Sequence, residues 1–440
     1  MKHTLSFSTR RSFMKFCLTA GATPFIAPST LWGQTAPSNT ITLAMIGLGR
    51  QAIQINMPPL LAMKRVRLVA LCDVDGWRVD KAKSEVDRYY GNSDCAVYRD
   101  WREVIARNDI DAVMNSTPDH WHVPISLAAV KSGKHVSCEK PLTLSVAEGR
   151  LLANAVREKG VVFRTDTECR SHADMHRIAE LVRNGRVGKV VHIDVGVPEA
   201  DGPGGNAEPM AVPEELDYEM WLGPAPEKPY TVDRVHPAKA LTRPGWMRCR
   251  DTCEGIVTNW GTHMLDIAQL CLDTERSGPV EVEGTGVFPE PGSGLWNVLS
   301  SFEARFRYAS GATLRYHTDP AGAYIKVTGE AGWIHGDWLR PGPGLTTSDA
   351  ALLTAPLTED SIRIPQRADK EDFVNAILND VPVMIDAEIG HRTCSMGQIA
   401  HIAIQRGRKL AWDVDREQFT NDEDANTLLT RAIRGNWMEG

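Results

Sequence analysis

The sequence predicts an α/β protein with a doubly wound parallel sheet in its first half, followed by an α+β domain. Three observations support this fold class. An apolar strand that begins at Ile41 leads into a glycine turn and a helical pattern that ends near Met63. Strand-length and helix-length runs then alternate to about residue 165, as repeated βα units do. Later runs, including 301–308, 313–317 and 324–328, alternate apolar and polar residues as antiparallel strands do.

Length and composition set the frame for function. The chain has 440 residues, 42% of them hydrophobic and 24% charged, which is long for one core and predicts two domains. The net charge is -7, and no block rich in Lys or Arg occurs beyond the N-terminus. This charge pattern argues against nucleic acid as a partner.

The N-terminal segment is typical of a targeting signal. "STRRSFMKF" (Ser8 to Phe16) places paired arginines before a phenylalanine, and a modestly apolar run, 17–32, follows. This order resembles a twin-arginine export signal, with a basic disordered tail as the alternative. The apolar run is broken by prolines and is too short for a stable membrane span. We therefore expect a periplasmic or otherwise exported protein, with the mature domain beginning near Asn39.

The cysteines give no sign of a metal site. Outside the signal there is one close pair, Cys249 and Cys253, and no histidine with zinc-ligand spacing accompanies it. The other spacings are irregular, which favours buried free thiols over a disulfide framework.

The glycine turn after the first strand has the spacing of a dinucleotide-binding motif. Gly47 and Gly49 are followed by Ala52, between a strand and a helix. The first glycine allows a tight turn, the second lets the backbone approach a pyrophosphate, and the helix N-terminus faces the phosphates. Arg50 and Gln51 lie in the same turn and are expected to contact the cofactor. A glycine-rich βα turn without a ligand is the alternative.

The residue at the end of the second strand indicates which cofactor is bound. Asp73 ends "VRLVALCD", where a carboxylate can accept hydrogen bonds from the adenosine ribose and repel a 2′-phosphate. This favours NAD. Arg78 nearby keeps NADP possible.

Charged and polar residues follow the next strands of the predicted parallel sheet. In "GKHVSCEKPLTL" an apolar strand ends in Glu139 and Lys140, and Thr117, Pro118 and His122 follow the strand before it. Ligands bind beyond the carboxyl ends of strands in such sheets, so all five are expected at the cofactor rim. Lys140 would lie beside the nicotinamide as a proton donor. A surface ion pair between Glu139 and Lys140 is the alternative.

These motifs resemble those of the Gfo/Idh/MocA oxidoreductases. The residues that carry the resemblance are "GLGRQA", "NSTPDHWHVPISLAAVKSGKHVSCEKPL", "WLGPAP" and "NWGTHMLDIA", and it extends almost from Ile41 to the C-terminus. It implies an NAD(P)-binding domain and a second α/β domain with a large, open, mostly antiparallel sheet used for oligomerisation. We accordingly expect a signal and linker over 1–38, a Rossmann domain over 39–165, and a substrate and oligomerisation domain over 166–440.

The resemblance also implies residue roles. Lys140 matches the lysine that contacts cofactor and substrate, and His263 matches the histidine that usually acts as acid or base. Relatives commonly carry an aspartate four residues before this histidine, and this chain has Asn259 there. An amide can hold an imidazole but cannot stabilise an imidazolium as a carboxylate does. Asn259 is therefore a candidate substrate contact.

Further candidates for substrate contact are less specific. Arg170 follows a predicted strand, and Tyr230 and Trp246 could stack on a sugar face, although structural roles are the commoner explanation for such residues.

The sequence therefore predicts an NAD(P)-dependent enzyme that transfers hydride at a CH–OH group of a sugar, a polyol or a derivative. Export would separate the enzyme from the cytoplasmic cofactor pool, so the cofactor is expected to be tightly bound. One alternative is an NAD-dependent glycoside hydrolase or lyase that oxidises the sugar transiently. The other is a non-catalytic carbohydrate-binding protein with the same fold.

Overall fold

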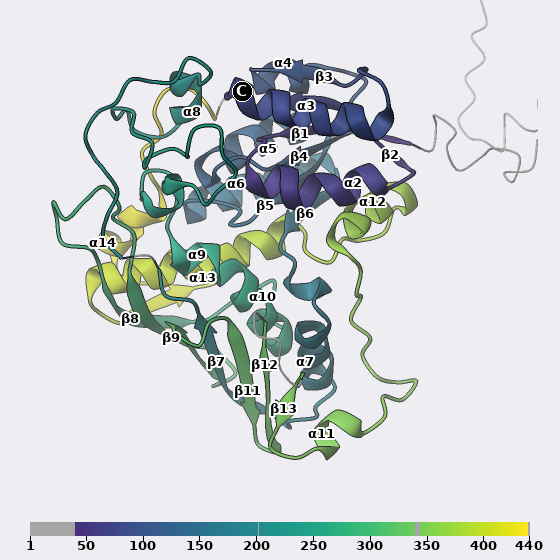
Figure 1. The fold of residues 1–440 in the computed structure, drawn as a ribbon. Coiled ribbons are helices and arrows are strands. Elements are labelled where there is room, and N and C mark those ends of the chain that lie inside the picture. Colours follow the sequence, from purple (N-terminus) through teal and green to yellow (C-terminus); the bar gives the residue numbers. More distant parts are fainter. Residues whose placement is uncertain (1–39, 201, 339–343, 439–440) are drawn as a thin grey trace, which may run out of the picture. The chain divides into compact units, whose positions relative to one another are not determined.

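The computed structural model describes residues 40–200, 202–338 and 344–438, and from Ile41 onward they form one unit (Figure 1). The predicted export signal lies outside the described residues. Within those described ranges, no helix combines the length and apolar character needed to cross a bilayer.

A six-stranded parallel sheet forms the first half, as predicted. Its order is β3-β2-β1-β4-β5-β6, so the chain leaves β1 in one direction and returns to the other side of it at β4. The strands are β1 (Ile41–Ile46), β2 (Val66–Cys72), β3 (Ala96–Tyr98), β4 (Ala112–Asn115), β5 (His135–Glu139) and β6 (Phe163–Asp166). The reversal between β1 and β4 is the point at which open α/β sheets bind ligands.

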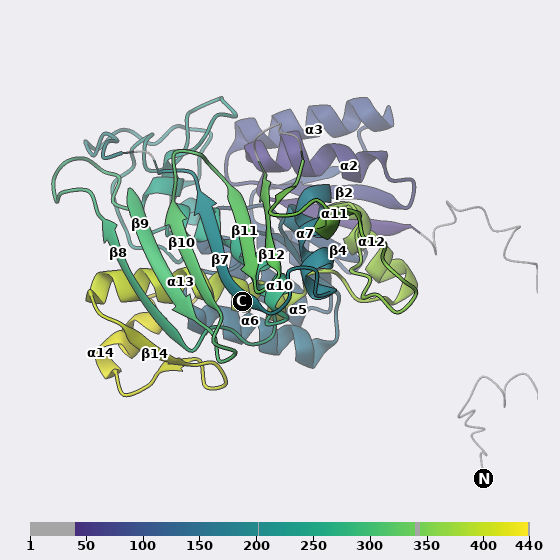
Figure 2. The same ribbon diagram turned by 90° about the horizontal axis from the view of Figure 1, so that it is seen from below.

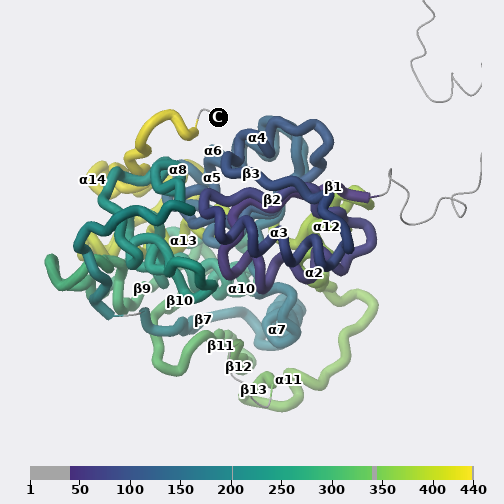
Figure 3. Tube along the Cα trace, turned by 45° about the horizontal axis from the view of Figure 1, so that its top comes forward, coloured from purple at the N-terminus to yellow at the C-terminus, as the bar shows by residue number. Residues whose placement is uncertain are grey.

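Helices cover both faces of this sheet. One face packs against α4 (Trp101–Ile105), α5 (His122–Lys131) and α6 (Val146–Lys159). The other face packs against α2 (Met57–Ala62), α3 (Gly76–Tyr90) and α12 (Asp369–Asn379). Helix α12 comes from the far end of the sequence, and Figures 1 and 3 both show it beside α2. The C-terminal part of the chain thus completes the core of the first sheet.

Local sequence signals explain where these helices begin and end. Ser145 is the N-cap of α6: its hydroxyl accepts from the backbone N–H of Glu148 and donates to the carboxylate of Glu148 at 2.9 Å. Asp75 caps α3 by accepting from the backbone N–H groups of Trp77 and Arg78. Helices α3 and α6 therefore have their first free donors satisfied within the chain.

A π-helical turn, η3 (Ala52–Asn56), follows the glycine turn directly. Its cause is the pair Pro58 and Pro59, which have no N–H groups to donate to the carbonyls of residues 54 and 55. The helix widens instead, and the N–H of Met57 bonds to the carbonyl of Ala52. This widening buries Asn56, whose amide donates to Glu139 at 2.9 Å.

The second sheet has nine strands in the order β13-β12-β11-β7-β10-β9-β8-β14-β15. All neighbours are antiparallel except β7 and β10, which run parallel, so the sheet is mostly antiparallel. Its strands are β7 (Val190–Val197), β8 (Glu281–Val287), β9 (Ser301–Arg307), β10 (Thr313–Thr318), β11 (Tyr324–Gly329), β12 (Gly332–Asp337), β13 (Thr346–Thr347), β14 (Leu410–Asp413) and β15 (Gln418–Phe419).

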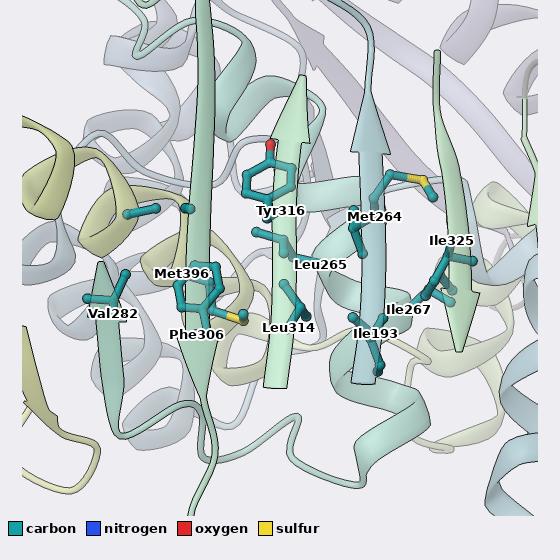
Figure 4. Packing of buried hydrophobic residues seen from close by; sticks show 14 of the residues in the cluster. Ile193, Met264, Leu265, Ile267, Val282, Phe306, Leu314, Tyr316, Ile325 and Met396 are labelled. Atoms are coloured by element: carbon teal, nitrogen blue, oxygen red, sulfur yellow. The ribbon is translucent and has the colours of Figure 1, made fainter. Parts of the chain in front are cut away.

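Helices cover one face of this sheet. They are α7 (Ala173–Arg183), α10 (Gly261–Leu272) and α13 (Ala387–Arg406). Figure 4 shows Met264, Leu265 and Ile267 of α10 beside the inward side chains of the strands. Figure 2 views the opposite face, over which no helix is drawn. That face carries polar pairs such as Arg315 with Glu303 at 2.8 Å.

Shorter helices lie in the connections and near the C-terminus. They are η4 (Asp119–Trp121), η5 (Cys169–Ser171), α8 (Tyr218–Leu222), η6 (Gly245–Arg248), α9 (Ile256–Asn259), α11 (Ala351–Thr354), α14 (Glu423–Asn426) and η7 (Thr427–Leu429). The final segment packs back on the first sheet's helices: Arg431 pairs with Glu148 at 2.9 Å, and Trp437 packs edge-on against Trp121.

A buried ion cluster joins β6 to α12. Arg164 has a fully buried side chain, and its guanidinium contacts the carboxylates of Asp166, Asp369 and Asp372. Lys370 also pairs with Asp166. Buried charges are tolerated only when they are paired and hydrogen-bonded, so this cluster ties the last strand of the first sheet to the C-terminal half.

We expect Arg164→Met to destabilise the protein strongly, because it leaves buried carboxylates without their shared cation. The free energy of unfolding should fall by about 3 to 5 kcal/mol, measured by chemical denaturation. Arg408→Gln, which removes an exposed guanidinium that pairs with Asp422, is the control and should not change the denaturation midpoint. An Arg164→Met protein with the midpoint of the unaltered protein would show that the cluster does not stabilise the fold.

Candidate functional site

A cavity of about 660 Å³ runs along the carboxyl edge of the first sheet and reaches α10. One end lies at the glycine turn between β1 and η3, and the other lies between Lys140 and His263. Of the residues predicted from the sequence, the following line this cavity: Gly47, Gly49, Arg50, Gln51, Asp73, Thr117, Pro118, His122, Glu139, Lys140, Trp246, Asn259 and His263.

The glycine turn leaves no room for a side chain at its first position. Gly47 has φ +84, and a Cβ at this position would lie 2.6 Å from the backbone of Ser116 and Thr117. No side chain fits there, so β1 and β4 approach each other directly beneath the turn. This narrow turn at the start of a helix fits the pyrophosphate of a dinucleotide, which binds through backbone N–H groups.

Asp73 holds the turn as well as facing the cavity. One carboxylate oxygen accepts from the N–H of Leu48 at 2.6 Å, and the other accepts from the N–H of Asp75 at 2.9 Å. Burial raises the pKa of Asp73, and the positive charge of Arg78 opposes that rise. Each oxygen keeps a second lone pair, so a ribose hydroxyl can still bond to it. The predicted contact with ribose is thus compatible with a structural role in the turn.

The Glu139-Lys140 pair lies at the end of β5, and the Lys140–Pro141 peptide bond is cis. Glu139 is buried and accepts from Asn56, so it belongs to the interior of the rim rather than to a surface ion pair. Burial and the nearby charges of Asp166 and Glu168 raise the pKa of Glu139 to about 8. Lys140 is the partly exposed member of the pair, and it lines the cavity.

His122 lies between two segments of the rim, the loop after β4 and the loop after β5 that carries Lys140. Its ring nitrogens lie 2.7 Å from the carbonyl oxygen of Pro141 and 2.9 Å from that of Thr117. Burial lowers the pKa of His122 to about 4, so the ring is neutral at physiological pH. A neutral ring carries one N–H and donates to one of the two carbonyl oxygens at a time.

His263 lies on α10 at the other end of the cavity. Its Nδ1 shares a hydrogen bond of 2.5 Å with the hydroxyl of Thr167 and lies 3.6 Å from the carboxylate of Glu168. Burial, followed by the charge of Lys140, holds the pKa of His263 well below its usual range. The ring of Trp338 packs edge-on against the imidazole, with the two ring centroids 4.6 Å apart. Because Nδ1 is engaged, Nε2 is the nitrogen available to a substrate.

Two predicted substrate contacts lie elsewhere. Arg170 is buried and pairs with Asp266 at 2.6 Å and with Glu275 at 2.7 Å, so its guanidinium supports α10 rather than the cavity. Tyr230 is buried among apolar side chains, where its ring packs edge-on against Tyr218. Neither residue is among those that line the cavity.

Other cavity residues were not predicted from the sequence. Glu168 follows β6, so the rule that strand ends carry functional residues could have identified it. Asp119 begins η4 beside Lys140, is 3% exposed, and has one carboxylate oxygen without a hydrogen-bond partner among the described residues. Burial raises the pKa of Asp119 to about 7. Trp260 and Trp338 add aromatic faces at the His263 end. Trp260 lies within the "NWGTHMLDIA" motif, whereas no local motif marks Trp338.

Family comparison agrees with this geometry. Residues 41–167 match the "Oxidoreductase family, NAD-binding Rossmann fold" domain, and residues 202–439 match the "Oxidoreductase family, C-terminal alpha/beta domain". The chain therefore belongs to the Gfo/Idh/MocA oxidoreductase family, with an NAD-binding Rossmann fold in its first half.

Individual relatives share only part of their length with this chain, at low sequence identity. An uncharacterized oxidoreductase, ORF334, of Rhizobium meliloti is 27% identical over 46% of this chain and 62% of its own length. D-glucoside 3-dehydrogenase of Escherichia coli (strain K12) is 28% identical over 35% of this chain and 42% of its own. A glycosyl hydrolase family 109 protein of Stenotrophomonas maltophilia (strain K279a) is 25% identical over 42% of this chain and 41% of its own. The chain thus aligns with less than two thirds of each relative.

The fold is shared with solved structures. The aldose-aldose oxidoreductase from Caulobacter crescentus, complexed with glycerol, superposes with a TM-score of 0.61 at 20% identity. The match covers 84% of this chain and 99% of that one.

We expect Gly47→Ala to reduce NAD affinity at least tenfold, because the added methyl group collides with the backbone of Ser116 and Thr117. Affinity would be measured by calorimetric titration. Gly91→Ala is the matched control: Gly91 also has a positive φ, +68, but a methyl group there meets no atom within 4 Å. Both variants carry the strain of an alanine in the left-handed region, about 1 kcal/mol or more. Equal NAD affinity in the two variants would therefore contradict the argument that the collision with Ser116 and Thr117 disturbs the turn.

Proposed function

We propose that this protein is an NAD-dependent oxidoreductase that acts on a CH–OH group of a sugar or sugar derivative. The observation that carries the proposal is the single cavity that extends from the glycine turn to Lys140 and His263. The family match to an NAD-binding domain supports the cofactor, and D-glucoside 3-dehydrogenase among the relatives supports the substrate class. Bound NAD would accept the hydride.

The chain's own residues would bind the cofactor and handle the substrate proton. The glycine turn, Asp73 and the rim residues Thr117 and Glu139 would hold the cofactor. Lys140 would bond the reacting hydroxyl and take or return its proton. His263, through Nε2, would be the second proton-handling group on the far side of the substrate.

The aromatic residues at the His263 end fit a carbohydrate. Trp260 and Trp338 line this part of the cavity, and flat rings pack well against the apolar faces of sugars. Charged and amide groups beside them, including Glu168 and Asn259, would bond the hydroxyls. The combination of ring faces and hydrogen-bonding groups is what a polyhydroxylated ligand requires.

A second candidate is glycoside cleavage through transient oxidation, with no net redox change. Two observations favour it: glycosyl hydrolase family 109 proteins are among the relatives, and Asp119 is a buried acid in the cavity beside Lys140. An elimination needs one group to remove a proton and another to protonate the leaving oxygen, and Asp119 could serve as that further acid. Release of the aglycone from a glycoside without accumulation of NADH would distinguish this candidate from the first.

We further propose that the protein is exported by the twin-arginine route with its cofactor already bound. The N-terminal sequence supports this, since that signal resembles those of proteins exported in the folded state. Denaturing the purified, exported protein should release NAD, or NADP, in a one-to-one ratio, identified by mass spectrometry. An empty protein that also fails to bind added nucleotide would exclude both enzymatic candidates and leave a carbohydrate-binding protein.

We expect Lys140→Ala to lower turnover by about 10²- to 10⁴-fold, because a positioned proton donor or acceptor contributes that much. The variant should still release nucleotide on denaturation, since the glycine turn is intact. Lys131→Ala, at the exposed C-terminal end of α5, is the control and should turn over normally. Unchanged turnover in Lys140→Ala would disprove the assignment of this lysine.

A further inference from the structure

A carboxylate approaches His263 from outside its own helix. The position four residues before His263 is Asn259, an uncharged amide that lines the cavity. Glu168, in the loop after β6, places Oε2 3.6 Å from Nδ1 of His263. A charge is therefore present beside the imidazole, although it comes from a different part of the fold.

The contacts of Glu168 hold it at the cavity wall. Its Oε1 accepts from the side-chain amide of Gln51 at 3.3 Å, and its side chain is 34% exposed. Gln51 belongs to the glycine turn, so Glu168 connects that turn to the histidine. The separation of 3.6 Å is too long for a hydrogen bond, and Glu168 acts on the imidazole through its charge.

The charge matters because of the tautomers of a neutral histidine. If Thr167 donates its hydroxyl proton to Nδ1, the ring proton lies on Nε2, and Nε2 cannot accept a substrate proton. If the ring proton lies on Nδ1 and is donated to the Thr167 oxygen, Nε2 has a free lone pair. A negative charge beside Nδ1 favours the second arrangement.

We propose that Glu168 is a positioning residue whose charge keeps the ring proton of His263 on Nδ1, so that Nε2 is the base that faces the substrate. The proposal rests on the proposed oxidoreductase function and deepens it. Glu168 thus supplies the negative charge that Asn259 lacks.

The other groups around His263 do not supply this charge. Lys140, from the end of β5, is positive and opposes protonation of the ring. Asp266, on the same helix, is neutralised by its pair with Arg170. Trp338, after β12, is uncharged, and His172 lies on the far side of it with ring centroids 6.4 Å apart. The negative charge that acts on Nδ1 is therefore that of Glu168.

The test is a titration of histidine-labelled full-length protein by ¹⁵N NMR, with the His263 signals assigned from their loss in His263→Gln. In the unaltered protein we expect Nδ1 protonated and Nε2 unprotonated at neutral pH. In Glu168→Gln, which keeps the shape and the bond to Gln51, the proton should move toward Nε2. The titration of His263 should also shift to lower pH by about one unit, because removal of a negative neighbour disfavours the imidazolium.

Two further variants sharpen the test. Glu168→Gln combined with Asn259→Asp places a carboxylate four residues before the histidine, at the end of α9, and should restore protonation of Nδ1. Asp174→Asn removes the same charge six residues further along the chain, in the first turn of α7, and should leave His263 unchanged. The proposal would be overturned if the ring proton lay on Nε2 in the unaltered protein. It would also be overturned if Glu168→Gln changed neither the tautomer nor the titration of His263.

Kinetics give a second readout once a substrate is found. The acid limb of kcat/KM against pH should move to lower pH in Glu168→Gln, with a loss of about tenfold at neutral pH, and the double variant should reverse both changes. A purely structural role for Glu168 could lower the rate but would not move the limb. The NMR result does not need turnover, so absence of activity with the expected tautomer would count against the proposed function alone.

Discussion

The buried guanidinium of Arg164 sets the position of the last strand of the first sheet, and much of the site depends on that strand. Its contacts with Asp166, Asp369 and Asp372 join the end of β6 to α12 around a fully buried arginine side chain. Thr167 and Glu168 follow immediately, and their contacts with His263 require β6 to end at a fixed place. A shift of this strand end would separate the histidine from both partners.

The same rim connects cofactor binding to proton handling. Gln51 reaches from the glycine turn to Glu168, and Asn56 reaches from the π-helical turn to Glu139. Both contacts start in the segment that wraps the pyrophosphate position and end beside Lys140 or His263. Two prolines widen η3, and the wider turn buries Asn56. The prolines thus influence the carboxyl group of Glu139, which Asn56 contacts.

Sequence reasoning placed residues at the cavity where the determining interactions are local. Gly47 and Lys140 are identified by a strand, a turn and a helix that are adjacent in the chain, and the alternation of short runs indicated both sheets. It failed where partners lie far apart in sequence. Arg170 is turned away from the cavity by Asp266 and Glu275, about a hundred residues later, and no local pattern reveals that pairing. Trp338 reaches His263 only because β12 lies in the same sheet as the strands under α10.

Helix α12 has a consequence for how the chain acquires its structure during synthesis. Phe373 and Val374 fill the apolar layer between the first sheet and its helices, and Asp369 and Asp372 neutralise Arg164. While the ribosome is still translating the second sheet, the nascent nucleotide-binding half has part of an apolar face uncovered, and Arg164 has Asp166 but lacks its other two carboxylate partners. Co-translational folding of that half therefore stays incomplete until the segment around residue 370 emerges, and a fragment that ends near residue 167 would be prone to aggregate rather than to behave as an independent module.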